Sequence, residues 1–266
     1  MPTMMTQSPR HQDQHIAVTG AGSGIGRAVA LRLAEDGARL SLFARRLPLL
    51  KETAELARAA GASEVFISAC DITDRKRVVD VFVRGAQALG PLQALVANAG
   101  IGGRNDPGSD DRFDALVSTN LTGSYNTLRA AQRVLAEPAE PRHLIVISSI
   151  LGRIGVAGYT GYCASKAGLL GLVRALAMEL ASENVQVNAI CPGWVDTDMA
   201  WEGLRGLGDA LGISAEEAKK VAMRDVPLGR MSHPSEIAAM VSWLVSGDAR
   251  GITGQALDIN NGAFML

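Results

Sequence analysis

Short apolar segments alternate with amphipathic segments along almost the whole chain, and this alternation constrains the fold more than any other feature. The run "HIAVT" at 15–19 is β-branched and typical of a buried strand. The segment after it has helical spacing, with Ile25, Val29 and Leu33 on one face and Gly37 as a stop signal. The same pair of elements then recurs down the chain.

The repetition predicts about seven strands connected by helices. After the first strand, strands are expected within 39–44, 64–69, 92–100, 143–149, 185–193 and 254–262. After the first helix, helices are expected at 47–61, 74–90, 120–136, 160–182 and 234–246. Short apolar strands that alternate with helices form a parallel sheet covered on both faces. Right-handed crossovers then give an α/β, doubly wound, single-domain fold.

No linker divides the alternation, so we expect one domain over residues 15–266. Residues 1–14 lack any periodic pattern and are predicted to be a disordered lead-in. The one long break, at about 194–232, follows a strand and contains a predicted helix at 214–223. Loops at the carboxyl ends of strands line the ligand crevice of such folds. We therefore predict that this segment is a substrate lid, and a decorative insertion is the alternative.

Composition argues against several classes of protein. The formal net charge of -1 gives no electrostatic basis for binding nucleic acid or an acidic membrane. Four histidines and three widely separated cysteines leave little for a metal site, and reduced thiols suit the cytoplasm. No stretch approaches the ~18 apolar residues of a membrane helix. We expect a cytoplasmic protein that binds no metal and acts on a small molecule.

A glycine-rich turn, "TGAGSGIG" at 19–26, lies between the first strand and the first helix. Glycine allows a sharp turn and lets backbone N–H groups approach a pyrophosphate at a helix N-terminus. Gly20, Gly24 and Gly26 give the spacing T-G-x-x-x-G-x-G rather than G-x-G-x-x-G. Because of its position, the turn favours nucleotide binding over a plain tight corner.

The end of the second strand indicates which dinucleotide binds. An acidic residue there would accept hydrogen bonds from the ribose 2′-OH of NAD. This chain has Arg45 and Arg46 instead, which suit a 2′-phosphate. Asp36 does not replace the missing acid, because it ends the first helix. The sequence favours NADP(H) over NAD(H), with a solvated charged pair as the alternative.

Tyr162 and Lys166 are one helical turn apart in "YCASK". A free tyrosine titrates near pH ~10, and a nearby ammonium group favours the phenolate. We therefore expect a tyrosine of lowered pKa that exchanges a proton with a carbonyl or alcohol. Ser149 ends a strand thirteen residues before Tyr162, where its hydroxyl can hold a substrate oxygen. Its neighbour Ser148 is expected to cap or pack.

With these features the chain resembles the classical short-chain dehydrogenases/reductases and, among them, the ketoreductases. The resemblance spans nearly everything from His15 to Gly262 and rests on "TGAGSGIG", "CDIT" (70–73), "ANAG" (97–100), "STN" (118–120), "ISS" (147–149), "YCASK" (162–166) and "CPGWVDTDM" (191–199). "ANAG" departs from the commoner N-N-A-G at its first position but keeps Asn98. The resemblance implies a Rossmann-type fold.

The resemblance also implies the roles of the catalytic residues. Tyr162 would be the general acid or base, and Ser149 would orient the carbonyl. Lys166 would lower the pKa of Tyr162 and bind the nicotinamide ribose, and Asn120 would hold a water in a relay to Lys166. The implied cofactor-binding set is Gly20, Ser23, Gly24, Ile25, Gly26, Arg45, Arg46, Asp71, Ile72, Asn98, Ala99, Gly100, Tyr162, Lys166, Pro192, Gly193, Val195 and Thr197.

Three segments are expected to face the substrate: residues 101–107, residues 150–159 and the lid from Trp194. They offer a set of apolar side chains, which suits a bulky ring or an acyl group. The candidate substrate residues are Ile150, Leu151, Ile154, Trp194, Met199 and Trp201, although the Met and Trp residues can equally be lid packing. Arg104 and Arg153 could meet a carboxylate or carrier phosphate, with surface arginines as the default reading.

Three functions remain open. The first is NADPH-dependent reduction of a bulky ketone or a 3-oxoacyl group, free or as a CoA or carrier-protein thioester. The second is NAD-dependent oxidation of a secondary alcohol or hydroxyacyl-CoA. The third is a nucleotide-binding subunit without turnover, which the presence of all four tetrad residues disfavours. The resemblance further implies a homotetramer or homodimer, with the helix of Tyr162 and the C-terminal segment as interfaces.

Overall fold

A computed structural model of the protein describes residues 10–138 and 141–265. Its seven strands are β1 (His15–Thr19), β2 (Arg39–Ala44), β3 (Val65–Ala69), β4 (Ala94–Ala97), β5 (Arg142–Ile147), β6 (Val185–Pro192) and β7 (Ala256–Ile259). They form one sheet in the order β3-β2-β1-β4-β5-β6-β7, and every pair is parallel. The predicted doubly wound α/β fold is confirmed, and the strand order reverses between β1 and β4.

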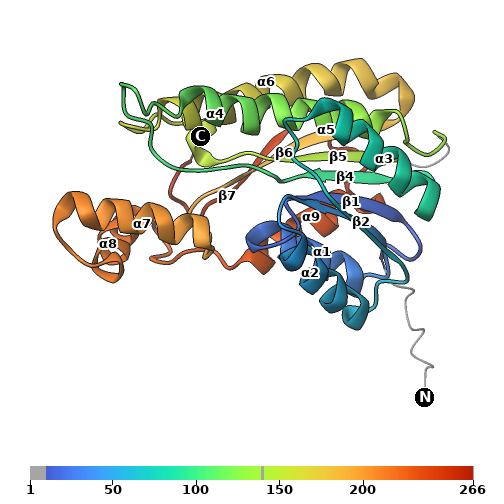
Figure 1. Ribbon diagram of the computed structural model, residues 1–266, viewed down its shortest axis with the longest axis horizontal. Coiled ribbons are helices and arrows are strands. Elements are labelled where there is room, and N and C mark those ends of the chain that lie inside the picture. Colours follow the sequence, from blue (N-terminus) through green and yellow to red (C-terminus); the bar gives the residue numbers. More distant parts are fainter. Residues whose placement is uncertain (1–9, 139–140, 266) are drawn as a thin grey trace.

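Nine α-helices accompany the sheet within the described residues. They are α1 (Gly24–Glu35), α2 (Leu47–Ala60), α3 (Arg75–Leu89), α4 (Phe113–Val117), α5 (Ser124–Gln132), α6 (Thr160–Leu180), α7 (Asp198–Leu211), α8 (Ala215–Ala222) and α9 (Pro234–Leu244). Helices α1, α2 and α9 cover one face of the sheet, and α3, α5 and α6 cover the other (Figure 1).

Each face of the sheet has its own apolar core. Successive residues of a strand point to opposite faces, so Ile16 and Val18 join the core under α1 and α9, and Ala17 joins the other. All three side chains are fully buried. This double burial explains why β4 is a continuous apolar run and why most positions of β1 and β5 are apolar.

The helix predicted at 120–136 begins earlier than expected. Helix α4 starts at Phe113, where the Asp111 carboxylate accepts a hydrogen bond from the backbone N–H of Phe113 at 2.9 Å. The chain then passes through a π-helical segment, Ser118–Gly123, into α5. The glycine and β-branched residues of this segment conceal from the sequence pattern that one helical rod runs through it.

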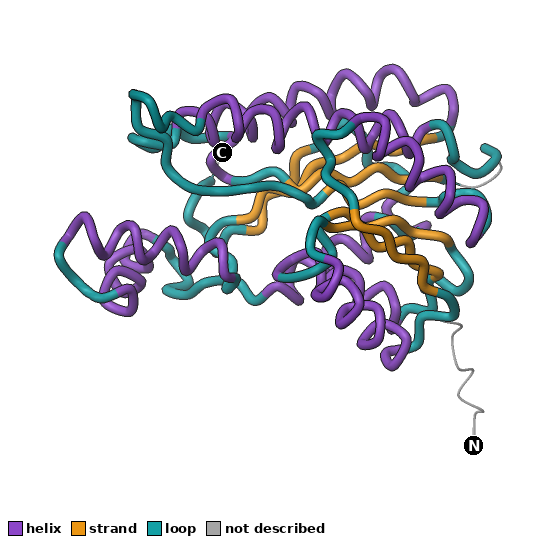
Figure 2. The backbone as a smooth tube through the Cα atoms, in the orientation of Figure 1, coloured by secondary structure: helices purple, strands orange, loops and turns teal. Residues whose placement is uncertain are grey.

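The break at 194–232 holds two helices, although only the second was predicted. Thr197 caps α7 through a hydrogen bond from the N–H of Ala200, and Gly212 ends it in the left-handed region. Three glycines inside α7 weaken its helical pattern. Figure 2 shows α7 and α8 as a pair of helices at one end of the molecule. The Lys219 ammonium, on α8, lies 4.9 Å from the ring centroid of Trp201 on α7.

The predicted disordered lead-in, 1–14, is too long. His11 is fully buried, and its Nε2 lies 3.0 Å from the carbonyl oxygen of Ser242 on α9. Its backbone N–H also donates to the carbonyl of Asp36 at the end of α1. These contacts seat the segment from residue 10 onward against two helices, and residues 1–9 lie outside the described residues.

Candidate active site

The predicted site residues follow strands that end at one edge of the sheet. Thr19 ends β1, Ala97 ends β4 and Ile147 ends β5. Because all strands are parallel, their carboxyl ends meet at this edge and the loops after them converge. The glycine-rich turn, "ANAG" and "ISS" are thus brought side by side from positions about 130 residues apart.

Three glycines of the turn occupy positions where a side chain would be strained or would clash. Gly20 and Gly24 have φ values of 68° and 53°, in the left-handed region that favours glycine. A Cβ on Gly26 would lie 2.2 Å from the carbonyl oxygen of Gly20 and 2.5 Å from Nδ2 of Asn98. The turn therefore presents backbone at the start of α1, as binding of a pyrophosphate requires.

Asn98 joins β4 to this turn. Its Nδ2 donates to the carbonyl of Thr19 at 3.0 Å and to that of Gly20 at 3.3 Å. The Thr19 hydroxyl accepts hydrogen bonds from the backbone N–H groups of Asn98 and Ala99, each at 3.1 Å. The asparagine kept in "ANAG" therefore ties the end of β4 to the glycine-rich turn.

A cleft of about 210 Å³ opens along this edge. Its predicted lining residues are Gly20, Ser23, Gly24, Ile25, Arg45, Arg46, Asp71, Ile72, Asn98, Ala99, Gly100, Thr197 and Met199. The residues that sequence reasoning did not single out are Gly22, Phe43, Ala44, Cys70, Ile101, Thr119 and Asp198. Gly22, Cys70, Thr119 and Asp198 lie within the quoted motifs. Ile101 directly follows one of them, and Phe43 and Ala44 are the last two residues of β2, so these positions are the signal for finding them.

Several predicted cofactor residues do not line this cleft. They are Gly26, Tyr162, Lys166, Pro192, Gly193 and Val195. Gly26 instead lies under the glycine-rich turn, and Pro192 ends β6. Gly193 is packed tightly, since a Cβ there would lie 3.0 Å from the Asn260 backbone.

The two arginines lie at the mouth of the cleft, beside the start of α1. Nη2 of Arg46 donates to the Ser23 hydroxyl at 3.3 Å, and both side chains are exposed. Across the cleft, hydrogen bonds from Thr73 hold the pKa of the Asp71 carboxyl below its ordinary value, and the positive charge of Arg45 adds to this. The mouth of the cleft thus carries two cations and a stably ionised carboxylate.

The two serines after β5 have different surroundings. Ser148 donates to the carbonyl of Lys166 at 2.9 Å and so ties β5 to α6, as expected of a packing residue. Ser149 accepts a hydrogen bond from the N–H of Leu151 at 3.1 Å, and its hydroxyl acts to lower the pKa of the Tyr162 phenol. Ser149 is therefore the hydroxyl beside Tyr162.

The Lys166 ammonium is buried and lies 5.6 Å from the ring centroid of Tyr162. It donates to the carbonyl of Ile147 at 2.9 Å. Burial lowers the pKa of Lys166 to about 8. Burial likewise raises the pKa of Tyr162 to about 12, and the hydrogen bond from Ser149 opposes this only in part. The pKa of Tyr162 in this structure is therefore raised, opposite to the expected lowering, because desolvation outweighs the hydrogen bonding of Ser149.

Asn120 is fully buried in the π-helical segment. Its Oδ1 accepts from the N–H of Ile101 at 2.8 Å, and its Nδ2 donates to the carbonyl of Ile101 and to the Ser165 hydroxyl. A Cβ on Gly100 would lie 3.0 Å from Oδ1 of Asn120 and 3.8 Å from Nζ of Lys166. The structure therefore brings Asn120 and Lys166 to the same glycine.

Of the six candidate substrate residues, Met199 lines the cleft. Trp201 does not line the cleft, and its indole N–H donates to the Asp196 carboxylate at 2.7 Å. Trp194 packs near Gly203 of α7, and Ile150 is buried in a short 3₁₀ turn that also contains Leu151, with Ile154 just after it. Arg153 is paired with Asp258 at 2.9 Å, so it is a structural cation in this fold.

Metal binding and membrane spanning each have a structural signature that can be read in the described part of the chain. Residues 10–138 and 141–265 contain no group of three or more His, Cys, Asp or Glu side chains placed to hold a metal ion. In the same residues, no helix is both long and apolar enough to cross a membrane.

The fold and the site together define an α/β oxidoreductase of the dinucleotide-binding class. A family model described as "Enoyl-(Acyl carrier protein) reductase" matches residues 20–263. A 3-oxoacyl-[acyl-carrier-protein] reductase FabG of Staphylococcus aureus is 34% identical over 251 residues, which cover 93% of this chain and 97% of the relative. The chain belongs to the short-chain dehydrogenase/reductase family.

Solved structures agree with this assignment. A variant of the actinorhodin polyketide ketoreductase, solved with NADPH, superposes with a TM-score of 0.88 at 33% identity, covering 95% of this chain and 98% of that one. A short-chain type dehydrogenase/reductase from Mycobacterium marinum gives a TM-score of 0.86 at 28% identity, covering 97% and 98%.

Proposed function

We propose that this protein is an NADPH-dependent reductase that converts a ketone into a secondary alcohol. The observation that carries the proposal is the composition of one sheet edge. Arg45 and Arg46 lie at the mouth of a glycine-lined cleft, and a neutral phenol, Tyr162, lies beside Ser149 on the same edge. The kinship with a 3-oxoacyl reductase and a polyketide ketoreductase supports the same chemistry.

The residues of the cleft fit a dinucleotide. The glycines of the turn at Gly20–Gly26 leave its backbone open to a pyrophosphate, and we propose that Asp71 and Ile72, which line the cleft, contact an adenine. NADPH supplies the hydride when it is bound. We propose that the remaining cofactor-binding residues are those expected from the sequence, with Thr197 at the nicotinamide end, where it already approaches Gly24.

Protonation of Tyr162 suits reduction. With a pKa of about 12, the phenol is neutral at physiological pH and can donate its proton to the carbonyl oxygen. The carbonyl carbon gains the hydride while that oxygen gains the proton, so the product is a neutral alcohol. Ser149 donates a hydrogen bond to the same oxygen and holds it near the phenol.

Lys166 and Asn120 would restore the proton after each turnover. Lys166 has a pKa of about 8, so its protonated and neutral forms are both accessible near neutral pH. We propose that it passes a proton toward Tyr162 through a water held near Asn120. The approach of both side chains to Gly100 supports this arrangement.

For the substrate, we propose a bulky ketone or a 3-oxoacyl group, presented as a CoA or carrier-protein thioester. The apolar candidates Trp194, Met199 and Trp201 support an acyl or alicyclic group, and Met199 is the one that lines the cleft. We further propose that 194–232 acts as this lid within the single domain 15–266. A homotetramer or homodimer in the cytoplasm completes the proposal.

Initial rates with both nicotinamide cofactors test the function. The purified protein is assayed at 340 nm with acetoacetyl-CoA and with 1-decalone, a fused bicyclic ketone, against NADPH and NADH. We expect turnover at least tenfold more efficient with NADPH. A tenfold preference for NADH, with faster alcohol oxidation, would instead support the catabolic dehydrogenase. No turnover of any ketone or alcohol, despite tight NADPH binding, would support the non-catalytic alternative.

A further inference from the structure

A buried asparagine in the loop between β4 and α4 is not among the predicted site residues, yet it contacts the start of the helix that carries Tyr162. Asn105 is only 5% exposed, although the loop around it is largely at the surface. Its Nδ2 donates to the Asp111 carboxylate at 3.1 Å and to the Thr160 hydroxyl at 2.9 Å, and its Oδ1 accepts from the N–H of Gly161 at 2.8 Å. Both N–H donors of this amide are therefore used, and its oxygen also has a partner.

The contact with Gly161 satisfies the first turn of the catalytic helix. The first N–H groups of a helix have no partner within it and need a cap. The residue at the N-cap of α6 is Tyr159, whose side chain makes no capping hydrogen bond. The amide of Asn105, 56 residues away in the sequence, takes that place. Tyr162 is the third residue of this same turn.

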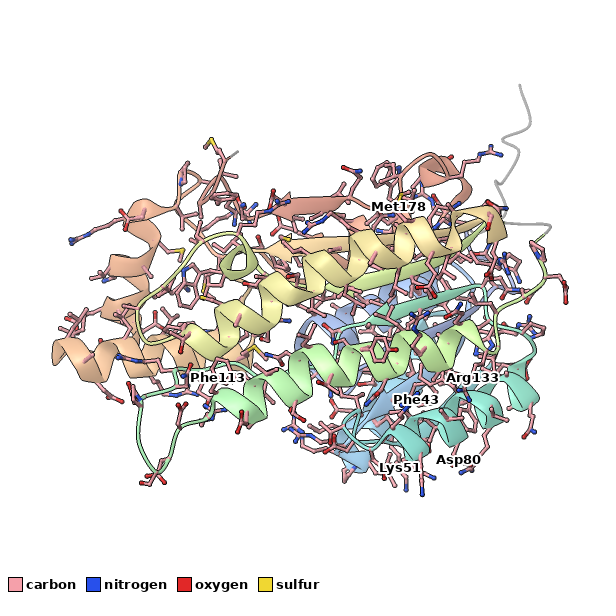
Figure 3. The ribbon with its side chains drawn as sticks, turned by 90° about the horizontal axis from the view of Figure 1, so that it is seen from above. Phe43, Lys51, Asp80, Phe113, Arg133 and Met178 are labelled. Carbon is pink, nitrogen blue, oxygen red and sulfur yellow. The ribbon has the colours of Figure 1, made fainter. Side chains whose placement is uncertain are left out.

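The contact with Asp111 extends the network to a second helix. The same Oδ1 of Asp111 accepts from Asn105 and from the N–H of Phe113, the first residue of α4. Helix α4 continues directly into the segment that holds Asn120. In Figure 3, where Phe113 is labelled, the α4–α5 rod runs beside α6. One amide thus joins the starts of the two helices that carry Asn120 and Tyr162.

The surrounding packing leaves little freedom for other arrangements. The N–H of Asn105 donates to the carbonyl of Gly158 at 3.0 Å, which ties the two loops by their backbones as well. A Cβ on Gly161 would lie 3.1 Å from the Leu116 side chain and from the Phe113 backbone. Helices α4 and α6 therefore meet closely beside Asn105, which bonds to α6 directly and to α4 through Asp111.

We propose that Asn105 is a positioning residue for the reduction, which acts by fixing the first turn of α6 and hence the phenol of Tyr162. The inference rests on the proposed function but concerns a residue outside the tetrad. Small displacements of a proton donor reduce its rate of transfer strongly. The loss should therefore appear in kcat, whereas the distant NADPH-binding turn should be unaffected.

The first test compares Asn105→Ala with Asp110→Ala, a change at an exposed position of the same loop. With acetoacetyl-CoA, we expect kcat to fall about tenfold in Asn105→Ala, as loss of one buried capping interaction predicts. The Kd of NADPH, measured by fluorescence, should stay within twofold, and Asp110→Ala should resemble the parent. A kcat within twofold of the parent would overturn the inference, as would parallel losses in kcat and NADPH affinity.

The second test exchanges the two functional groups. In the double variant Asn105→Asp/Asp111→Asn, the new carboxylate at position 105 can still accept from the N–H of Gly161. The new amide at position 111 can donate to that carboxylate through its NH₂ group and accept from the N–H of Phe113 through its oxygen. We expect kcat to recover to within threefold of the parent. Failure to recover in a folded, NADPH-binding double variant would count against positioning.

A third measurement does not depend on turnover. Hydrogen–deuterium exchange of a peptide covering 158–164 reports the protection of the Gly161 amide. We expect at least tenfold faster exchange in Asn105→Ala and near-parental exchange in the double variant. Unchanged exchange would overturn the inference even if the protein reduces ketones. Conversely, if the parent protein shows no turnover but the Gly161 amide exchanges faster in Asn105→Ala, the capping role of Asn105 stands and only the proposed function is rejected.

Discussion

The two edges of the sheet both bury polar side chains, but only one edge leaves them able to react. At the amino edge, the His15 imidazole lies 2.8 Å from the Ser41 hydroxyl and 2.7 Å from the Gly90 carbonyl. These contacts use both ring nitrogens. At the carboxyl edge, the Ser149 hydroxyl influences the pKa of the Tyr162 phenol, and the loops there open into a cleft.

The same physical effect acts at both edges. Burial favours the neutral form, so it lowers the pKa of His15 and of His143 to about 4 and raises that of Tyr162 to about 12. A neutral histidine enclosed at the amino edge has no substrate to meet. A neutral phenol at the carboxyl edge is a proton donor. Burial sets the protonation state, and position in the parallel sheet decides whether it matters.

The largest expected effect is at the carboxyl edge. Tyr162→Phe removes the proton donor and little else, so kcat for ketone reduction should fall by about 10³-fold or more. The Kd of NADPH and the thermal midpoint should change little, because the ring is retained. Retention of a tenth of the parental kcat would show that another group supplies the proton.

The adjacent serines test the comparison within one strand end. Ser149→Ala should lower kcat by about 10²-fold through loss of the hydrogen bond to the substrate oxygen. Ser148→Ala should leave kcat within about threefold but cost about 1 kcal/mol of unfolding free energy, since the carbonyl of Lys166 loses its partner. Steady-state kinetics and urea unfolding distinguish them, and equal kinetic losses would contradict the assignment.

The amino edge should govern stability in acid. Because the folded-state pKa values of His15 and His143 lie near 4, below the ordinary 6.5, the unfolded chain binds more protons between these values. Stability should therefore fall as the pH drops from 6.5 toward 4, by roughly 2 to 3 kcal/mol for each histidine. Urea unfolding at several pH values measures this.

His143→Leu isolates one of these contributions. The slope of unfolding free energy against pH should become shallower over this window, while kcat at pH 7 should stay within twofold of the parent. An unchanged slope would show that His143 does not titrate as its burial indicates.

The smallest expected effect is at the mouth of the cleft, where the cations are exposed. Arg45→Ala/Arg46→Ala should raise the KM for NADPH by about tenfold, which corresponds to about 1.4 kcal/mol, because two partners of a 2′-phosphate are lost. The kcat/KM with NADH should not fall. Rates measured with both cofactors check this, and equal losses for the two would indicate a structural role for the arginines.

Much of the site could be predicted from local sequence. Strands and helices follow from hydrophobic spacing, and Gly20 and Gly26 from the turn between β1 and α1. The interval between Ser149 and Tyr162 predicted Ser149 as the serine of the site, and the structure gives Ser148 a packing contact with Lys166 instead. These signals are local, because each depends on residues within one or two elements.

The remaining features depend on contacts between distant segments. Burial of His11 follows from packing against α1 and α9, and the pKa of Tyr162 follows from desolvation by the whole fold. Asn105 carried no signal in a polar, glycine-rich loop, since its partner Gly161 lies 56 residues away.

The sequence by itself therefore determined the elements, the fold class and the residues able to do the chemistry. The tertiary structure alone decided which of them meet, what caps the helix of Tyr162 and which protonation state burial favours. Secondary structure is encoded by periodicity over a few residues, whereas desolvation and long-range hydrogen bonds exist only once the chain has packed.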